Sequence, residues 1–300
     1  MKTHTHVVGA ADAFLEELAA GGASPKTVEA RRLGLIRFLR HCDQEGVHRV
    51  RDITLSFLEA YRGTLCRTDL ADATVEQYLR GPRLLLAQLA ERGVIFENPA
   101  RHLAIRRQVG RLPRVPSEAQ VRRLLAQPST HTPLGRRDRA LMELLYSTGA
   151  RVSEAVGVSV DDLDLDAGTV RLFGKGRRER LCPVGAACAR ALRLYLCDAR
   201  ARLLKGEDSA ALWIGIRGEA LKIQNVEVRM RTYSSAAGIK PAIAPHGLRR
   251  AMATHMLHHG ADPITLQTIL GHASLQHLSQ YLRLTIGDIR RMHRRSRLGE

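Results

Sequence analysis

Apolar residues recur at helical spacing in four segments of the first hundred residues, and the last three segments begin at a Ser or Thr that can cap a helix. The predicted helices cover Phe14–Leu18, a stretch from Ser24 to about His41, a stretch from Thr54 through Leu65, and a stretch from Thr74 toward Gly93. In the second helix, Leu35, Ile36 and Leu39 are expected to face inward. This pattern predicts a small four-helix module.

A basic stretch without apolar periodicity comes after the module. Residues 104–116 contain four arginines, two prolines and one glycine, a composition typical of a linker. Ser117 and Gln120 then have the spacing of a capping box, which predicts the first helix of a second domain. The expected domains are residues 1–110 and 111–300.

The second domain is predicted to be helical with a small β-sheet. One helix ends at Gly149, and Ser153 and Glu154 are expected to cap a short helix after it. Two strand-like runs flank residues 174–178, Gly-Lys-Gly-Arg-Arg, so Lys175 is expected at or near the tip of a hairpin. A further helix is expected over residues 185–206.

Residues 244–281 predict a helical hairpin that gathers polar side chains. His246 and Arg249 are three positions apart, so one helical face carries both. Capping signals then mark two more helices: Asp262 with Pro263 starts one, Gly271 ends it, and Ser274 can cap the other. The hairpin returns His272 and Tyr281 toward the first pair. Each of these residues alone is typical of an ordinary surface or core position, whereas the set has the chemistry of a phosphate site.

The charge of the chain indicates a polyanionic partner. The net charge is +17 and the isoelectric point is about 10.6. Residues 1–110 have a net charge of +3 and residues 111–300 one of +14, so most of the positive field belongs to the second domain. Because Phe, Trp and Tyr make up only 4% of the chain, phosphate contacts are expected to outweigh base stacking.

The sequence gives no sign of a metal site, a cofactor site or a membrane segment. Its five cysteines form no CxxC pair and are expected to be reduced core thiols. The four aspartates of residues 161–166 alternate with leucine, which fits a solvated strand edge better than a metal site. There is no GxxxxGK[ST] loop and no apolar run of about 18 residues, so a soluble cytoplasmic protein associated with the nucleoid is predicted.

Three motifs of the second domain resemble the signature of tyrosine recombinases of the phage-integrase and Xer type. They are His-Gly-Leu-Arg at 246–249, Leu-Gly-His at 270–272 with Tyr281 nine places on, and Thr-Gly-Ala-Arg-Val-Ser-Glu at 148–154. In the first domain, Ser-Pro-Lys-Thr-Val at 24–28 and Asn-Pro-Ala at 98–100 resemble the core-binding domain of the same family. The resemblance implies a SAM-like four-helix domain that clamps DNA and an α+β catalytic domain.

The resemblance also implies DNA strand exchange that needs neither a metal ion nor ATP. The implied roles are Tyr281 as the nucleophile that forms a 3′-phosphotyrosine, Arg151 and Arg249 as ligands of the phosphate oxygens, Lys175 as the acid for the 5′ hydroxyl, His246 as an aid to proton transfer, and His272 as a hydrogen-bond donor to the phosphate. Lys175 is one of only six lysines among 47 Lys and Arg residues. Because arginine keeps its proton in proteins and lysine can lose it, a lysine here supports the acid role.

The implied partner is double-stranded DNA with an inverted-repeat core site, bound by a tetramer, alone or with a paralogous recombinase or an accessory protein. The basic C-terminal tail is expected either to dock on a neighbouring protomer or to lie solvated on DNA. Two alternatives remain, a DNA-binding regulator that does not cleave and a type IB topoisomerase. Arg250, where the family often has His, and Leu-Arg-Leu after Tyr281 leave open whether the chain is an integrase, a resolvase or a chromosome-dimer resolution enzyme.

Overall fold

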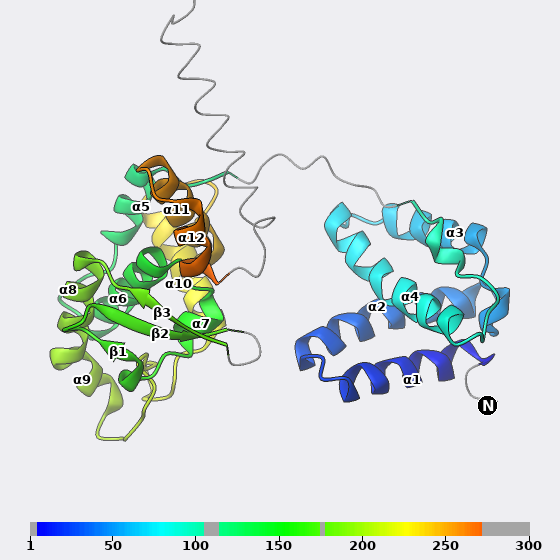
Figure 1. Cartoon of the computed structure of the whole chain (residues 1–300), viewed down its shortest axis with the longest axis horizontal. Coiled ribbons are helices and arrows are strands. Elements are labelled where there is room, and N and C mark those ends of the chain that lie inside the picture. The colour runs from blue at the N-terminus through cyan, green and yellow to red at the C-terminus, as the bar shows by residue number, and fades with distance from the viewer. Residues whose placement is uncertain (1–4, 105–113, 175–177, 272–300) are drawn as a thin grey trace, which may run out of the picture. The chain divides into compact units, whose positions relative to one another are not determined.

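The computed structural model describes residues 5–104, 114–174 and 178–271. The chain divides into two compact units, Met1–Arg111 and Leu112–Glu300, which are drawn in Figure 1. Lys175, His272, Tyr281 and the predicted helix that begins near Ser274 lie outside the described residues.

The regular elements of unit 1 are all helical in its described part. They are α1 (Val7–Ala20), α2 (Pro25–Gln44), the 3₁₀ turn η2 (Val50–Asp52), α3 (Leu55–Cys66), α4 (Asp72–Glu91) and the 3₁₀ turn η3 (Pro99–Arg101). The predicted caps are confirmed at two helices, because the side chains of Ser24 and Thr54 accept hydrogen bonds from the backbone N–H groups three residues later. The prediction for α4 is wrong by two residues: this helix begins at Asp72, which places a carboxylate in the first turn, where the helix dipole favours it.

Helices α2 and α4 pack closely because each has a glycine at the crossing. A Cβ atom on Gly34 would lie 2.8 Å from the carbonyl oxygen of Tyr78, and one on Gly81 would lie 3.0 Å from that of Arg31. Leu35 is buried at this crossing and Phe38 is buried against Phe57 and Tyr61 of α3, but Ile36 is exposed. The inward prediction for Ile36 is wrong because the buried stripe of α2 follows positions 35, 38 and 42, and Ile36 lies one residue, about 100°, to the side of it.

Unit 2 combines helices with one antiparallel sheet. Its elements are α5 (Glu118–Leu125), α6 (Pro133–Thr148), α7 (Val152–Val156), η4 (Val160–Asp162), β1 (Leu163–Asp164), β2 (Thr169–Phe173), β3 (Glu179–Pro183), α8 (Ala186–Leu194), the π-helical segment η6 (Tyr195–Ala199), α9 (Arg200–Leu204), α10 (Ile223–Ala236), α11 (Pro245–His258) and α12 (Pro263–Leu270). The strand order is β1-β2-β3, with Val170 opposite Cys182 and Phe173 opposite Glu179. The predicted fold class, mainly α with a small sheet, is confirmed.

The local signals of unit 2 agree with the structure at most boundaries. The capping box of Ser117 and Gln120 is formed, Asp262 caps α12, and Gly271 ends α12 with a left-handed conformation. Two predictions are corrected. Arg151, not Ser153, is the N-cap of α7. The expected helix 185–206 is continuous only through the π-helical segment η6, a local change of backbone register that side-chain periodicity does not reveal.

Helix α6 forms the centre of the unit 2 core. Its residues Leu141, Leu144 and Leu145 are buried, and α8, α11 and β3 pack against it. Three of the five cysteines belong to the cores of the two units as expected, whereas Cys66 and Cys197 are exposed. In the described parts of the chain, no helix is both long and apolar enough to cross a membrane.

Candidate active site

The turn between α6 and α7 presents Arg151 to solvent. Gly149 ends α6 with φ +59°, a left-handed conformation that glycine adopts without strain. Ala150 is buried behind the turn, and the side chain of Arg151 at the start of α7 is 48% exposed. The sequence therefore predicted correctly that the glycine turn delivers this arginine.

The buried carboxylate of Glu154 fixes the position of Arg151 by hydrogen bonds. Its side chain, 3% exposed, accepts a hydrogen bond from the Arg151 backbone N–H at 2.9 Å and one from Nη1 at 2.7 Å, and it also pairs with Arg180 on β3 at 2.6 Å. Burial alone would raise the pKa of Glu154, but the hydrogen bonds from Arg180 and Arg151 outweigh it and lower the pKa. Glu154 is thus an ionised anchor for two arginines, a role that its position in a capping pattern did not reveal.

Arg249 is the second arginine of the site and has the opposite environment. It lies on α11 with 1% of its surface exposed, and its guanidinium donates to the carbonyl oxygens of Gly149 and Leu270. These bonds connect the end of α6, α11 and the end of α12. A Cβ atom on Gly149 would lie only 2.8 Å from Cδ2 of Leu270, so glycine is needed for this close approach as well as for the turn.

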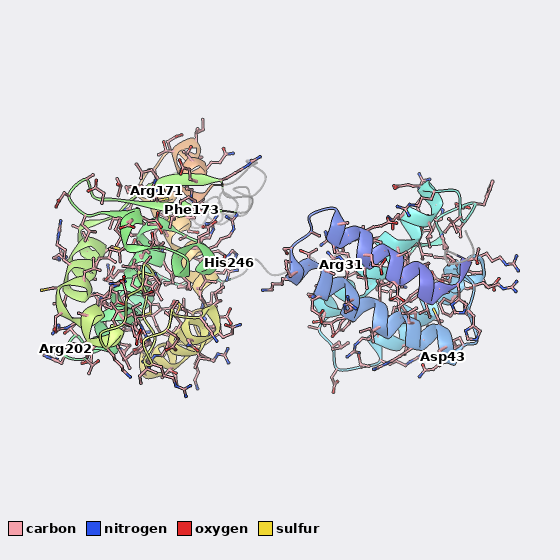
Figure 2. All side chains as sticks on the ribbon, turned by 90° about the horizontal axis from the view of Figure 1, so that it is seen from below. Arg31, Asp43, Arg171, Phe173, Arg202 and His246 are labelled. Carbon is pink, nitrogen blue, oxygen red and sulfur yellow. The ribbon has the colours of Figure 1, made fainter. Side chains whose placement is uncertain are left out.

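His246 lies in the first turn of α11, and its side chain is exposed at the surface of unit 2, as Figure 2 shows. Even so, partial loss of water around the ring lowers its pKa, and the positive charges of Arg250, Arg249 and Arg151 lower it further. The imidazole is therefore neutral near pH 7, when it can accept a proton at one nitrogen and donate one from the other.

Three of the six predicted site residues are therefore brought together. Arg249 donates to the carbonyl oxygen of Gly149, two residues before Arg151, and His246 lies three residues before Arg249 on α11. Lys175, His272 and Tyr281 lie outside the described residues, but Gly174 and Gly271, which directly precede two of them, are described. The prediction that one face of α11 carries His246 and Arg249 needs a refinement, because Arg249 is buried and His246 is exposed.

Two guanidinium groups and a neutral imidazole have the chemistry of an anion site with a proton acceptor beside it. Guanidinium groups bind phosphate oxygens with directed, charge-assisted hydrogen bonds. Over the ranges that the structure describes, no three His, Cys, Asp or Glu side chains gather as a metal site. The described groups thus have the chemistry to bind a phosphate and to move a proton.

Comparison with known proteins identifies the family. The family model for the phage integrase family matches residues 115–286. Tyrosine recombinase XerD of Shewanella oneidensis is 35% identical over 283 residues, which cover 94% of each chain. Tyrosine recombinase XerC 2 of Ralstonia nicotianae is 37% identical over 293 residues, which cover 94% of this chain and 83% of that protein.

Solved structures share the fold. XerH site-specific recombinase bound to a palindromic difH substrate, in a post-cleavage complex, matches with a TM-score of 0.74 at 22% identity, over 95% of this chain and 83% of that one. A lambda integrase dimer bound to a COC′ core site matches with a TM-score of 0.74 at 18% identity, over 92% of this chain and 77% of that one. The motifs, the fold and the relatives agree: the chain belongs to the phage integrase family and is a tyrosine recombinase, an enzyme that breaks and rejoins DNA at specific sites.

Proposed function

We propose that Tyr281 is the nucleophile of this recombinase and that Arg151, Lys175, His246, Arg249 and His272 complete its active site. The tyrosine oxygen attacks the scissile phosphorus, the P–O5′ bond breaks, and the 3′ phosphate stays on the protein as a phosphotyrosine. The 5′ oxygen leaves with a proton from Lys175. Because the phosphotyrosine keeps the bond energy, a 5′ hydroxyl of another duplex can reverse the attack without ATP.

The convergence of Arg151, Arg249 and His246 is the observation that carries this proposal. Phosphoryl transfer places negative charge on the non-bridging oxygens, and preorganised cations stabilise that charge without reorganising during the reaction. The fixed orientation of Arg249 between two carbonyl groups and the anchoring of Arg151 by Glu154 supply such preorganisation. The neutral His246 beside them can take the tyrosine proton.

The β2–β3 hairpin supports the role of Lys175. The backbone N–H of Gly174 donates to the carbonyl oxygen of Arg178 at 2.8 Å, so the hairpin is closed on both sides of Lys175. In the proposed role, the positive charges of the arginines in the site would favour release of a proton from Lys175.

We also propose that unit 1 clamps the DNA duplex and that four protomers assemble on an inverted-repeat core site. XerH and lambda integrase, which share the fold, have been solved on a palindromic site and on a core site. On unit 1, Arg31 lies where α2 crosses α4, since a Cβ atom on Gly81 would lie 3.0 Å from its carbonyl oxygen, and Arg80 directly precedes Gly81. In the proposed clamp, these two arginines contribute to a cationic surface. Such a surface fits a phosphate backbone. A paralogous recombinase or an accessory protein can share the assembly, and the nucleoid is the expected location.

The experiment that tests the nucleophile is identification of the residue that carries DNA. Purified protein is incubated with genomic fragments of its host, denatured, digested with nuclease and protease, and analysed by mass spectrometry. A nucleotide on the peptide that contains Tyr281, absent from the Tyr281→Phe variant, is expected. A nucleotide on any other residue, or an adduct that survives in Tyr281→Phe, would overturn the assignment.

A further inference from the structure

We infer that Arg180 on β3 is a positioning residue of the active site: it connects Glu154, the anchor of Arg151, to the end of helix α12. This inference rests on the proposed function, because it describes how the catalytic groups of that function are held. In this inference Arg180 acts through Glu154 and the end of α12.

The Arg180 side chain makes two directed contacts in different parts of the fold. Its Nη2 donates to Oε2 of Glu154 at 2.6 Å, and its Nε donates to the carbonyl oxygen of Ile269 at 2.9 Å. The thiol of Cys182, two residues along the same strand, donates to that carbonyl at 3.6 Å. The guanidinium therefore connects Glu154 of α7 to Ile269 in the last turn of α12, which lies 89 residues after Arg180 in the chain.

Two glycines lie against the same guanidinium. A Cβ atom on Gly271 would lie 3.1 Å from Cδ and from Nη1 of Arg180. One on Gly174 would lie 3.6 Å from Oε1 of Glu154 and 4.0 Å from Nη1 of Arg180. In the chain, Gly271 directly precedes His272 and Gly174 directly precedes Lys175, so the pair borders the backbone that leads into two of the proposed catalytic residues.

The two directed contacts of Arg180 require an arginine. The side chain is only 12% exposed, and its partner Glu154 is 3% exposed. Planar guanidinium donors point in fixed directions, so one group can reach a carboxylate and a carbonyl at once. A lysine ammonium is a single point on a flexible stem and cannot reproduce both contacts with the same geometry. Arg180→Lys thus keeps the charge and removes the connection.

The test is single-turnover DNA cleavage by full-length Arg180→Lys at saturating protein, next to DNA affinity and thermal unfolding. We expect unchanged affinity and cleavage that is about 100-fold slower, the size of effect that a small misplacement of catalytic groups produces. Arg202→Lys is the matched control. Arg202 of α9 is exposed and pairs with Asp198 of η6, and Figure 2 shows Arg202 on the other side of unit 2 from His246.

A substrate with a 5′-bridging sulfur separates positioning from acid catalysis. Sulfur leaves without a proton, so it is expected to restore Lys175→Ala but not Arg180→Lys. If the sulfur substrate fully restored cleavage by Arg180→Lys, the inference would be overturned, because Arg180 would then act only through Lys175. Cleavage by Arg180→Lys at the wild-type rate would also overturn it. If the wild-type protein itself does not cleave, the proposed function fails, and the inference fails with it.

A second variant covers the case in which Arg180→Lys does not fold. Glu154→Gln/Arg180→Met removes both buried charges, a change that folded proteins often tolerate. We expect this double variant to fold, to bind DNA and to cleave at least as slowly as Arg180→Lys. A folded double variant that cleaves at the wild-type rate would show that the connection is dispensable.

Discussion

The buried guanidinium of Arg249 donates a 2.8 Å hydrogen bond to the backbone carbonyl of Leu270, 21 residues later in the chain. The same guanidinium donates to the carbonyl of Gly149, 100 residues earlier. One side chain thus fixes the ends of α6 and α12 together. In the proposed mechanism this guanidinium also binds the scissile phosphate. The position of the bound phosphate and the positions of the two helix ends therefore depend on the same group.

Arg249→Lys is expected to slow cleavage by about 100-fold to 1,000-fold, the usual cost of losing one donor to a developing oxyanion. A lysine cannot span the carbonyls of Gly149 and Leu270, so a lower melting temperature is also expected. Single-turnover cleavage and calorimetry measure the two effects, with Arg202→Lys as the charge-matched control. Cleavage by Arg249→Lys at the rate of that control would contradict the proposed binding of the scissile phosphate by Arg249.

The pH dependence of cleavage is expected to follow His246. Its pKa lies below the usual 6.5, so the neutral ring that accepts the tyrosine proton predominates near pH 7 and is lost as the pH falls through the lowered pKa. Removing a nearby positive charge raises that pKa. Arg250→Gln should therefore move the acidic limb of the pH–rate profile to higher pH, while Arg202→Gln should leave it in place. If the acidic limb does not move in Arg250→Gln, a group other than His246 causes that limb.

Lys175→Ala is expected to cleave ordinary DNA poorly and DNA with a 5′-bridging sulfur at nearly the wild-type rate. The reason is that a thiolate leaves without general-acid help, whereas an alkoxide does not. Parallel single-turnover time courses with the two substrates measure the difference. If sulfur gives no rescue, the acid is another residue, and His246 is the first candidate.

Gly34→Ala is expected to destabilise unit 1 by about 1 to 3 kcal/mol, the usual cost of overpacking, because the new methyl group would meet the carbonyl of Tyr78 at 2.8 Å. Gly63→Ala is the matched control. A methyl group on Gly63, which lies on α3, would have nothing within 4 Å, so alanine should stabilise the helix by about 0.5 to 1 kcal/mol. Chemical denaturation followed by circular dichroism measures both changes, while the fluorescence of Trp213 follows unit 2 separately. Equal effects of the two substitutions would contradict the close helix crossing.

Local sequence signals predicted much of this structure. Ser24, Thr54 and Asp262 cap helices as expected, because capping depends on residues within three positions. The hairpin around Lys175 was predicted from turn chemistry between two strand-like runs. These features are decided by neighbours in the chain.

The features that the sequence did not predict depend on contacts between distant segments. Glu154 was interpreted as part of a helix cap, and its side chain does accept the backbone N–H of the N-cap residue Arg151, but its bond to Arg180 crosses 26 positions. The bond from Arg180 to Ile269 crosses 89 positions and ends on a backbone oxygen. Every residue has such an oxygen, so the residue type at position 269 gives no sign of this bond. The burial of Arg249 was likewise not evident, since only the packing of α6, α11 and α12 encloses it.

The most direct test of the central claim is capture of covalent protein–DNA adducts from denatured cells, followed by sequencing of the attached DNA, with Tyr281→Phe cells as the control. Site-specific recombination through Tyr281 predicts adducts at one or two recurring sequences, all lost in Tyr281→Phe. Adducts scattered over the genome, or no adducts with the wild-type protein, would contradict it.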